Sequence, residues 1–346
     1  GSSCSSESAP APAGIVEPNH ETNELHQALR PLCLLGTGAS STVRLARYRR
    51  TGALYAVKAT NATPGSETQL QALRELQVLR EGGAMSGLTQ LHEAYQIDGR
   101  IHFVLEWMAA GSLDQHLRRG DPVPVPPLAG IISQVLRGLD HLHVERRQLH
   151  RDLKPANILI DLYGAPRALP RPMFVWRFFC VANAPTLQFN LSATHKPTRL
   201  PPSLAGVVKL TDFGFATDRL DVTVAAAAHS FVGTGSYMAP ERIRGEPYSY
   251  AADIWSIGIL TIECAEGRHP LQPRTSSYID MATAIAKGPP PTLSQPDQFP
   301  EAFTELISRS LRSEPSERAT ISELRESPIL QQPFGAGTAW QQAASA

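Results

Sequence analysis

HRDLKPAN, residues His150–Asn157, brings an aspartate, a lysine and an asparagine close together in the chain. The apolar helical run before it stops at Val144 and Pro155 cannot continue a helix, so we expect a loop. On this loop Asp152 can accept the proton of a substrate hydroxyl, Lys154 can neutralise charge on a phosphoryl group, and Asn157 can ligate Mg²⁺. The alternative is a polar surface loop that matches the pattern by chance.

Two further motifs flank this loop in the chain. AVK, Ala56–Lys58, lies upstream, and DFG, Asp212–Gly214, follows a short apolar strand downstream. Lys58, expected at a cleft and not in the core, can contact the α- and β-phosphates of a nucleotide. Asp212 can hold the Mg²⁺ that bridges the β- and γ-phosphates. Three motifs in this order favour phosphoryl transfer over a chance match.

The composition is that of a globular enzyme with one large or two modest domains. The 346 residues have a formal net charge of zero and 42% are apolar, so neither nucleic acid nor a membrane is an expected partner. The four cysteines lack paired spacing, which predicts no disulfide framework or zinc site and favours the cytoplasm. No apolar run is long enough for a membrane span or signal peptide. We expect residues 1–28 to be a tag remnant and disordered leader.

The sequence from Leu29 to Ala59 predicts three strands. The first two flank a glycine-containing turn in which Gly36 and Gly38 let backbone amides approach a polyphosphate. The motif is weak alone, because Ser41 replaces its third glycine and a structural hairpin would look similar. A dinucleotide-binding turn is excluded, because these glycines join two strands and not a strand to a helix.

A helix is predicted over Ser66–Arg80. Ser66 can cap it with Gln69 three residues on, and leucines recur at helical spacing, at Leu70, Leu73, Leu76 and Leu79. Glu75 is either a solvated edge residue or the partner of Lys58 in an ion pair that directs the amine at ATP. We favour the ion pair, which a movement of the helix could break.

The next segments predict two strands joined at Asp98–Gly99, a connector over Glu106–Gly111 that can line a ligand cleft, a proline-dense loop over Pro122–Pro127 and an apolar helix over Leu128–Val144. The region after the DFG motif predicts mainly helices. Two parts of this region are not predicted as helices: the segment Phe215–Glu241, which has several hydroxyl side chains, and a loose tail after Phe334. Thr223, Ser230 and Thr234 in that segment could accept phosphate, with Arg151 as counter-charge, and Ser230 is the preferred regulatory site.

One segment, Ala165–Gly206, has no period and several prolines, and so long an insert is uncommon in a compact domain. Its removal would join DLYG, Asp161–Gly164, to VVKL, Val207–Leu210, as a hairpin. We expect a surface excursion, with a translated intron as the alternative.

Together these motifs resemble a eukaryotic protein kinase domain over Leu29–Leu330, apart from the insert. The residues that match are Gly36–Val43, Lys58, Glu75, HRDLKPAN, DFG, APE at Ala239–Glu241, Asp253 and Arg318. The resemblance implies a two-lobed α+β fold with ATP between the lobes. The small β-rich lobe with one regulatory helix would be 29–105, the hinge 106–111, the helical lobe 112–334 with the insert 165–206, and the tail 335–346.

The resemblance also implies roles for individual residues. The Glu106 carbonyl and the Met108 amide would bind adenine, Leu105 would be the gatekeeper, and Asp114 would face the ribose. Four apolar side chains would sandwich the base: Leu35, Val43, Ala56 and Leu159. Glu241 would pair with Arg318, and Asp253 would support a stack formed by Leu79, Leu91, His150 and Phe213.

Four segments are similar to mitogen-activated protein kinase kinases: LRELQVL, GSLDQHL, HSFVGTGSYMAPERI and DIWSIGILTIECAEGRHPL. This similarity implies a monomer that an upstream kinase activates and that phosphorylates Thr and Tyr of a MAP kinase. The sequence departs from that group at Ala226, where a second acceptor is expected, and lacks a recognisable docking segment. The alternatives are another Ser/Thr kinase or a nucleotide-binding pseudokinase or scaffold, but Lys58, Asp152, Asn157 and Asp212 are all present.

Overall fold

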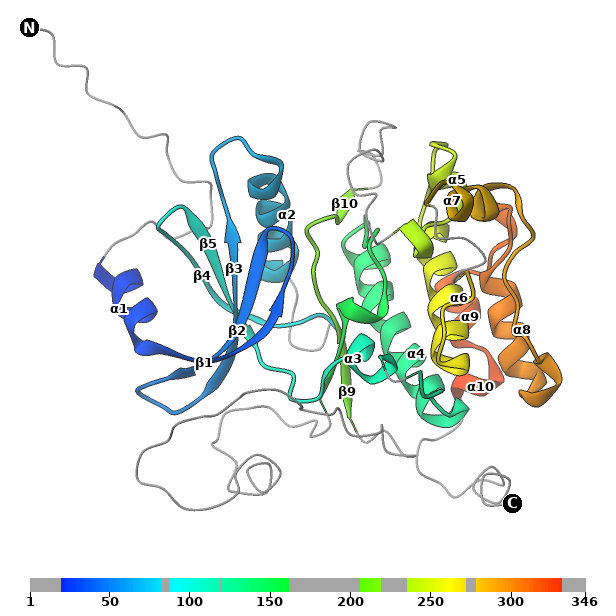
Figure 1. Ribbon diagram of the computed structural model, residues 1–346, viewed down its shortest axis with the longest axis horizontal. Coiled ribbons are helices and arrows are strands. Elements are labelled where there is room, and N and C mark those ends of the chain that lie inside the picture. Colours follow the sequence, from blue (N-terminus) through cyan, green and yellow to red (C-terminus); the bar gives the residue numbers. More distant parts are fainter. Residues whose placement is uncertain are drawn as a thin grey trace, which may run out of the picture. The chain divides into compact units, whose positions relative to one another are not determined.

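The computed structural model describes residues 20–81, 87–118, 120–161, 206–218, 235–271 and 278–331. They fall into two compact units (Figure 1). Unit 1 contains residues 20–81 and 89–107, and unit 2 contains 87–88, 108–161 and everything described from 206 onward. Unit 1 is built on a β-sheet and unit 2 is mostly helical, so the predicted α+β class is confirmed.

Unit 1 is a five-stranded antiparallel sheet in the order β1-β2-β3-β5-β4. The strands are β1 (Leu29–Thr37), β2 (Ser41–Tyr48), β3 (Leu54–Asn61), β4 (Leu91–Ile97) and β5 (Arg100–Glu106). The predicted turn between the last two is present, with Asp98 at φ 49° and Gly99 at φ 70°. Positive φ at both central residues is the hairpin geometry that matches strand twist.

Helix α1 (His20–Ala28) corrects the expectation of a disordered leader through residue 28. Its Leu25 packs on one face of the sheet, against a core formed by Leu29, Ala46, Tyr95 and Val104. His26 Nδ1 lies 3.0 Å from the Tyr95 hydroxyl. The sequence HETNELHQA has no apolar period, so tertiary contacts, and not amphipathic patterning, stabilise this helix.

Burial shifts the pKa values of two aromatic side chains near α1, Tyr95 and His102. It raises the pKa of Tyr95 to about 12. Burial, followed by the charge of His26, lowers the pKa of His102 to about 4. The two rings are stacked with centroids 4.9 Å apart, so His102 is a neutral part of the packing at neutral pH.

Helix α2 (Glu67–Glu81) starts where the capping prediction placed it, and Ser66 Oγ accepts a hydrogen bond from Gln69 N at 3.2 Å. The predicted leucine stripe is only half right, because Leu76 and Leu79 are buried but Leu70 is 47% exposed. A spacing of three residues drifts around a helix with 3.6 residues per turn. The buried stripe instead follows the spacing i, i+3, i+4, i+7, at Ala72, Glu75, Leu76 and Leu79.

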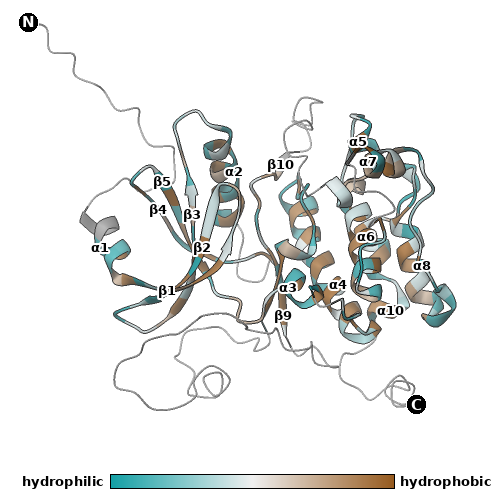
Figure 2. Ribbon diagram, viewed as in Figure 1, coloured by the Kyte–Doolittle hydropathy of each residue, from teal (hydrophilic) through white to brown (hydrophobic). Residues whose placement is uncertain are grey.

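Unit 2 contains two long buried helices, α4 (Val125–Asp140) and α6 (Ala251–Glu266), and apolar residues are prominent on both (Figure 2). The shorter helices are α3 (Leu113–Leu117), α5 (Pro240–Ile243), α7 (Tyr278–Lys287), α8 (Glu301–Ser310), α9 (Ile321–Arg325) and α10 (Pro328–Gln331). Small sheets are formed by β6 (Gly111–Ser112), β8 (Ile158–Asp161) and β9 (Val207–Leu210), and by β7 (Gln148–Leu149) with β10 (Thr217–Asp218). In the described chain, no helix has the length and apolarity needed to cross a membrane.

Helix α4 begins at Val125 and not at Leu128, so part of the expected proline loop is helical. Prolines fit a first helical turn, where the backbone N–H groups lack intrahelical partners in any case. The helix ends at Asp140, and a single π-helical turn, His141–Glu145, replaces the expected continuation to Val144.

The predicted hairpin around the insert is confirmed. Strands β8 and β9 pair antiparallel from Ile158 with Leu210 to Asp161 with Val207. Gln134 of α4 holds the second strand, since its Nε2 donates to Gly206 O at 3.2 Å and its Oε1 accepts from Val208 N at 2.9 Å. The insert itself, apart from Gly206, lies outside the described residues.

Candidate active site

The loop His150–Asn157 brings its three functional groups together within unit 2. The Asp152 side chain is nearly buried, and its Oδ2 lies 2.8 Å from Lys154 Nζ. Asn157 Nδ2 donates to the backbone carbonyl of Asp152 at 2.8 Å and to its Oδ2 at 3.0 Å. A carboxylate fixed by two donors in this way is positioned to accept a proton from a hydroxyl. The grouping predicted from HRDLKPAN is confirmed.

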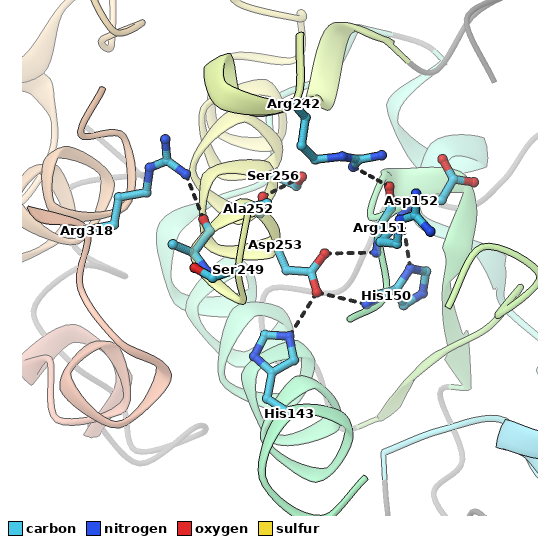
Figure 3. Close-up of polar contacts among 11 residues, drawn as sticks. His143, His150, Arg151, Asp152, Arg242, Ser249, Ala252, Asp253, Ser256 and Arg318 are labelled. Carbon is cyan, nitrogen blue, oxygen red and sulfur yellow. Dashed lines mark hydrogen bonds and ion pairs between the residues drawn. The ribbon is translucent and has the colours of Figure 1, made fainter. Parts of the chain in front are cut away.

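Asp253 of α6 holds the loop by hydrogen bonds to its backbone (Figure 3). Its carboxylate accepts hydrogen bonds from the backbone N–H groups of His150 and Arg151, both at 2.9 Å, and lies 2.8 Å from His143 Nε2. Burial by itself would raise the pKa of Asp253, but the hydrogen bond and charge of His143 and the contacts with His150 lower it to about 2. The carboxylate is therefore ionised and fixes the loop.

His143 is a supporting residue of the site that the sequence analysis missed. It lies within the apolar run that predicted a helix, where a histidine gives no local sign of a partner in a distant helix. Its ring stacks on Tyr250, with centroids 4.4 Å apart. Arg151, in contrast, has a backbone φ of 68°, which is uncommon for a residue other than glycine and shows that the surrounding bonds determine the loop conformation.

Asp212 follows Thr211, which is hydrogen-bonded directly to the loop His150–Asn157. Thr211 N donates to the carbonyl of Asn157 at 3.0 Å, and Asp212 has φ 64°. Phe213 is fully buried, and its ring centroid lies 5.3 Å from that of His150 in an edge-on arrangement.

The donor set at this position fits Mg²⁺. The amide nitrogen of Asn157 is used in two hydrogen bonds. Its oxygen has no hydrogen bond within the described residues and is available as a ligand. A carboxylate from Asp212 and an amide oxygen from Asn157 are the hard oxygen donors that Mg²⁺ prefers.

The predicted ion pair of unit 1 is confirmed. Lys58 Nζ on β3 lies 2.8 Å and 2.7 Å from the two carboxylate oxygens of Glu75 on α2. Only 12% of the lysine side chain and 3% of the glutamate side chain are exposed. The pair thus fixes the amine in a largely buried setting, and Lys58 itself is only partly buried.

Several predicted nucleotide-contact residues share one face of the sheet in unit 1. Val43 is paired with Lys58, and Ala56 with Leu105, in the strand register. Because side chains alternate between faces, residues 56 and 58 lie on the same face. Leu105 is buried, and Val43 and Ala56 are partly exposed.

The glycine hairpin lies at one end of this sheet. Gly38 N donates to Ser41 O at 2.8 Å, and an irregularity in the register falls at Leu35, between Leu34 and Gly36. A Cβ added to Gly36 would meet no atom within 4 Å. The fold itself does not require glycine at position 36, so the glycine is available for close approach of a ligand to the backbone.

The other predicted contact residues lie between the end of β5 and α3, and on β8. Glu106 Oε1 accepts from Gln90 N at 2.7 Å, and the Met108 carbonyl accepts from Gly111 N at 3.1 Å. Asp114 forms an exposed ion pair with Arg118 at 2.8 Å. Leu159 lies on β8, opposite Ser112. Their contacts with adenine, ribose and base stay predictions.

Of the predicted regulatory residues, Thr223, Ser230 and Thr234 lie outside the described residues. Arg151 is described, and its backbone carbonyl accepts a hydrogen bond from Arg242 NH1 at 2.7 Å.

The structural ion pair between Glu241 and Arg318 is confirmed, with N–O distances of 2.6 Å and 2.7 Å in a buried setting. Arg318 also donates to the backbone carbonyls of Ala251, Arg312 and Ser313. All five guanidinium N–H groups therefore have acceptors.

Comparison with known proteins agrees with this geometry. The family model for the protein kinase domain matches residues 30–330. The chain is 31% identical to mitogen-activated protein kinase kinase 2 of Arabidopsis thaliana, over 86% of this chain and 70% of that protein. It is 32% identical to mitogen-activated protein kinase kinase 1c of Physcomitrium patens, over 86% and 75%. It is also 28% identical to the dual specificity mitogen-activated protein kinase kinase dSOR1 of Drosophila melanogaster, over 87% and 70%.

Proposed function

Because this chain belongs to the protein kinase family and is therefore an ATP-dependent phosphotransferase, we propose that it is a dual-specificity mitogen-activated protein kinase kinase. The observation that supports this most directly is the intact loop, in which Lys154 and Asn157 position the carboxylate of Asp152. The similarity to several proteins with that name supports the choice of subgroup. Its substrate would be a MAP kinase.

In the proposed reaction, Asp152 orients the substrate hydroxyl and accepts its proton as the oxygen attacks the γ-phosphorus. Lys154 donates to the phosphoryl oxygens, where negative charge is present during transfer. Lys58, oriented by Glu75, contacts the α- and β-phosphates. Asn157 and Asp212 would hold Mg²⁺, which when bound offsets the charge of the phosphates.

We also propose the nucleotide contacts and the mode of regulation. Gly36 and Gly38 would offer backbone amides to the phosphates, and Glu106 and Met108 would bind adenine beside the gatekeeper Leu105. Leu35, Val43, Ala56 and Leu159 would enclose the base, and Asp114 would bind ribose by giving up its pair with Arg118. An upstream kinase would activate this cytoplasmic monomer at Ser230, with Thr223 and Thr234 as further candidates and Arg151 as counter-charge.

The experiment is to incubate the protein with ATP, Mg²⁺ and a panel of catalytically inactive MAP kinases, and to map the phosphorylated residues. We expect label on both Thr and Tyr of one activation loop. The label should disappear in Asp152→Asn, since no other group replaces that carboxylate. Asp297→Asn, an exposed carboxylate outside the site, is the matched control and should keep full activity.

Two other results would change the assignment. Label confined to serines elsewhere would indicate a general Ser/Thr kinase. ATP binding without any transfer, even in Ser230→Glu, would indicate a pseudokinase or scaffold.

A further inference from the structure

Three ring side chains join α1 to the sheet of unit 1 (Figure 1). His26 of α1 has its Nδ1 atom 3.0 Å from the hydroxyl of Tyr95 on β4. The His26 ring also meets the ring of His102 on β5 edge-on, with centroids 5.3 Å apart. His102 is itself stacked on Tyr95 with an interplanar angle of 2°. The Tyr95 hydroxyl stays uncharged in acid, because burial raises its pKa to about 12. Two histidines from different elements therefore meet at one buried, neutral tyrosine.

The surroundings of His102 disfavour a positive charge on its ring. Burial is the largest cause of its lowered pKa, and the charges of His26 and Arg100 act in the same direction. The Asp98 carboxylate opposes them and is the weakest of these four effects. On β3 the residue opposite His102 is Ala59, which carries no charge. A proton on His102 would thus lie in a mostly buried place, close to other cations.

Helix α1 depends on these contacts for its own stability. It has nine residues, and isolated helices shorter than about 12–15 residues are marginal in water. Its Leu25 packs against the core that contains Leu29 and Val104. Release of α1 from the sheet is therefore also the unfolding of α1, and the exchange of its backbone amides with solvent reports that release directly.

We propose that protonation of His102 releases α1 from the sheet, so that His26, Tyr95 and His102 form an acid-sensitive latch within unit 1. While α1 is docked, the proton has to enter a site that the helix covers and that His26 makes more positive. When α1 is released, His26 moves away and water reaches the His102 ring, which then takes up the proton at a lower cost. Acid therefore favours the released state.

Linkage gives the sign and the size of the effect. The pKa of His102 is about 4 with α1 docked, against an ordinary value of 6.5. Docking is at full strength above pH 7 and weakens as the pH falls from about 6.5 towards 4, below which the docked form is protonated as well. With the ordinary pKa in the released state, the equilibrium constant for docking falls about tenfold between pH 7.5 and pH 5.5.

The experiment is hydrogen–deuterium exchange of the full chain at pH 7.5 and pH 5.5, with each rate corrected for the intrinsic effect of pH on amide exchange. In the wild type the protection of the α1 amides is expected to fall about tenfold. The protection of α2, in the same unit, should stay constant, which separates local release from unfolding of the whole unit.

Three variants test the assignment of the latch. His102→Gln should make the protection of α1 independent of pH. His26→Gln, which can still bond to Tyr95, should show a smaller fall than the wild type, because it removes one of the two facing charges. His92→Gln is the matched control and should show the full fall, since His92 is an exposed histidine of β4 whose ring packs on Tyr55.

A second measurement decides the matter if α1 of His102→Gln is undocked at both pH values. The His102 ring is titrated by NMR in the wild type and in Leu25→Ser, which removes the apolar anchor of α1. The pKa of His102 is expected to be higher in Leu25→Ser, near that of an ordinary histidine.

Four results would overturn the proposal. They are wild-type α1 protection that does not change with pH, a fall that persists in full in His102→Gln, a parallel fall in α2, and identical titration of His102 in the wild type and in Leu25→Ser. None of these measurements depends on catalysis, so the kinase assignment and the latch can fail separately.

Discussion

At the scale of single residues, Asp253 shows how one buried carboxylate determines the conformation of a loop. Its carboxylate contacts the His143 ring and accepts hydrogen bonds from the backbone N–H groups of His150 and Arg151. These two residues directly precede Asp152, the proposed proton acceptor. We predict that Asp253→Asn lowers the free energy of unfolding by about 2 kcal/mol at neutral pH, in proportion to the lowered pKa. Urea denaturation measures the loss, and Asp297→Asn should show none.

The pH dependence of this difference has a defined sign. The pKa of Asp253 falls from 3.8 to about 2 on folding, so its stabilisation is complete above pH 5. The stabilisation is lost as the pH falls from about 4 towards 2, where the folded protein must also take up the proton. The gap between wild type and Asp253→Asn should stay constant from pH 8 to pH 5 and narrow below pH 4. A gap that narrows already at pH 6 would contradict this account.

The Lys58–Glu75 pair predicts two separable effects. Lys58→Met should abolish phosphoryl transfer, and it should also destabilise the protein by about 3–5 kcal/mol, because the buried Glu75 carboxylate loses the ammonium group that it contacts. The double variant Lys58→Met/Glu75→Gln should recover most of that stability without recovering activity. Phosphorylation assays and urea denaturation on the same preparations separate the two effects. A single variant as stable as the wild type would show that Glu75 finds another partner or water.

At the scale of elements, the β8–β9 hairpin makes a prediction about the insert. Asp161 and Val207 are already paired, so deletion of residues 165–205 leaves a short loop of Leu162, Tyr163, Gly164 and Gly206. Gly206 is retained because Gln134 binds its carbonyl. The shorter loop should stabilise the hairpin by about 2 kcal/mol through lower closure entropy. Thermal unfolding and kinase assays check this, and a deletion variant that does not fold would show that the insert is needed by the core.

Helices α1 and α2 show what limits prediction at this scale. The cap at Ser66 is a local signal, and it located the start of α2 correctly. The buried face of the same helix was only partly predicted, because it depends on which residues meet the sheet. Helix α1 had no local signal, and its position depends on Leu25 and His26 meeting residues far along the chain.

At the scale of the whole molecule, Arg318 links distant parts of unit 2 through its contacts with Glu241, Ala251, Arg312 and Ser313. We predict that Arg318→Met costs about 3–5 kcal/mol of stability, since it leaves the Glu241 carboxylate buried and unpaired. Arg318→Lys should recover little, because an ammonium cannot reproduce the planar five-donor geometry. Arg309→Met, at a partly exposed arginine, is the control. Urea denaturation followed by Trp255 fluorescence reports the change, because the Trp255 ring lies 5.1 Å below the guanidinium.

The sequence alone determined the chemistry of this protein. Phosphoryl transfer was indicated by the identities and order of five residues: Lys58, Glu75, Asp152, Asn157 and Asp212. Glycines, helix caps and alternating strand patterns located most helices and strands, because those signals depend only on neighbouring residues. Only the tertiary structure showed that His143 contacts Asp253, that α1 packs on the sheet, and that Arg242 and Arg151 both contact the Tyr248 ring. Each of these depends on contacts between residues far apart in the chain, and such contacts leave no mark in local sequence patterns.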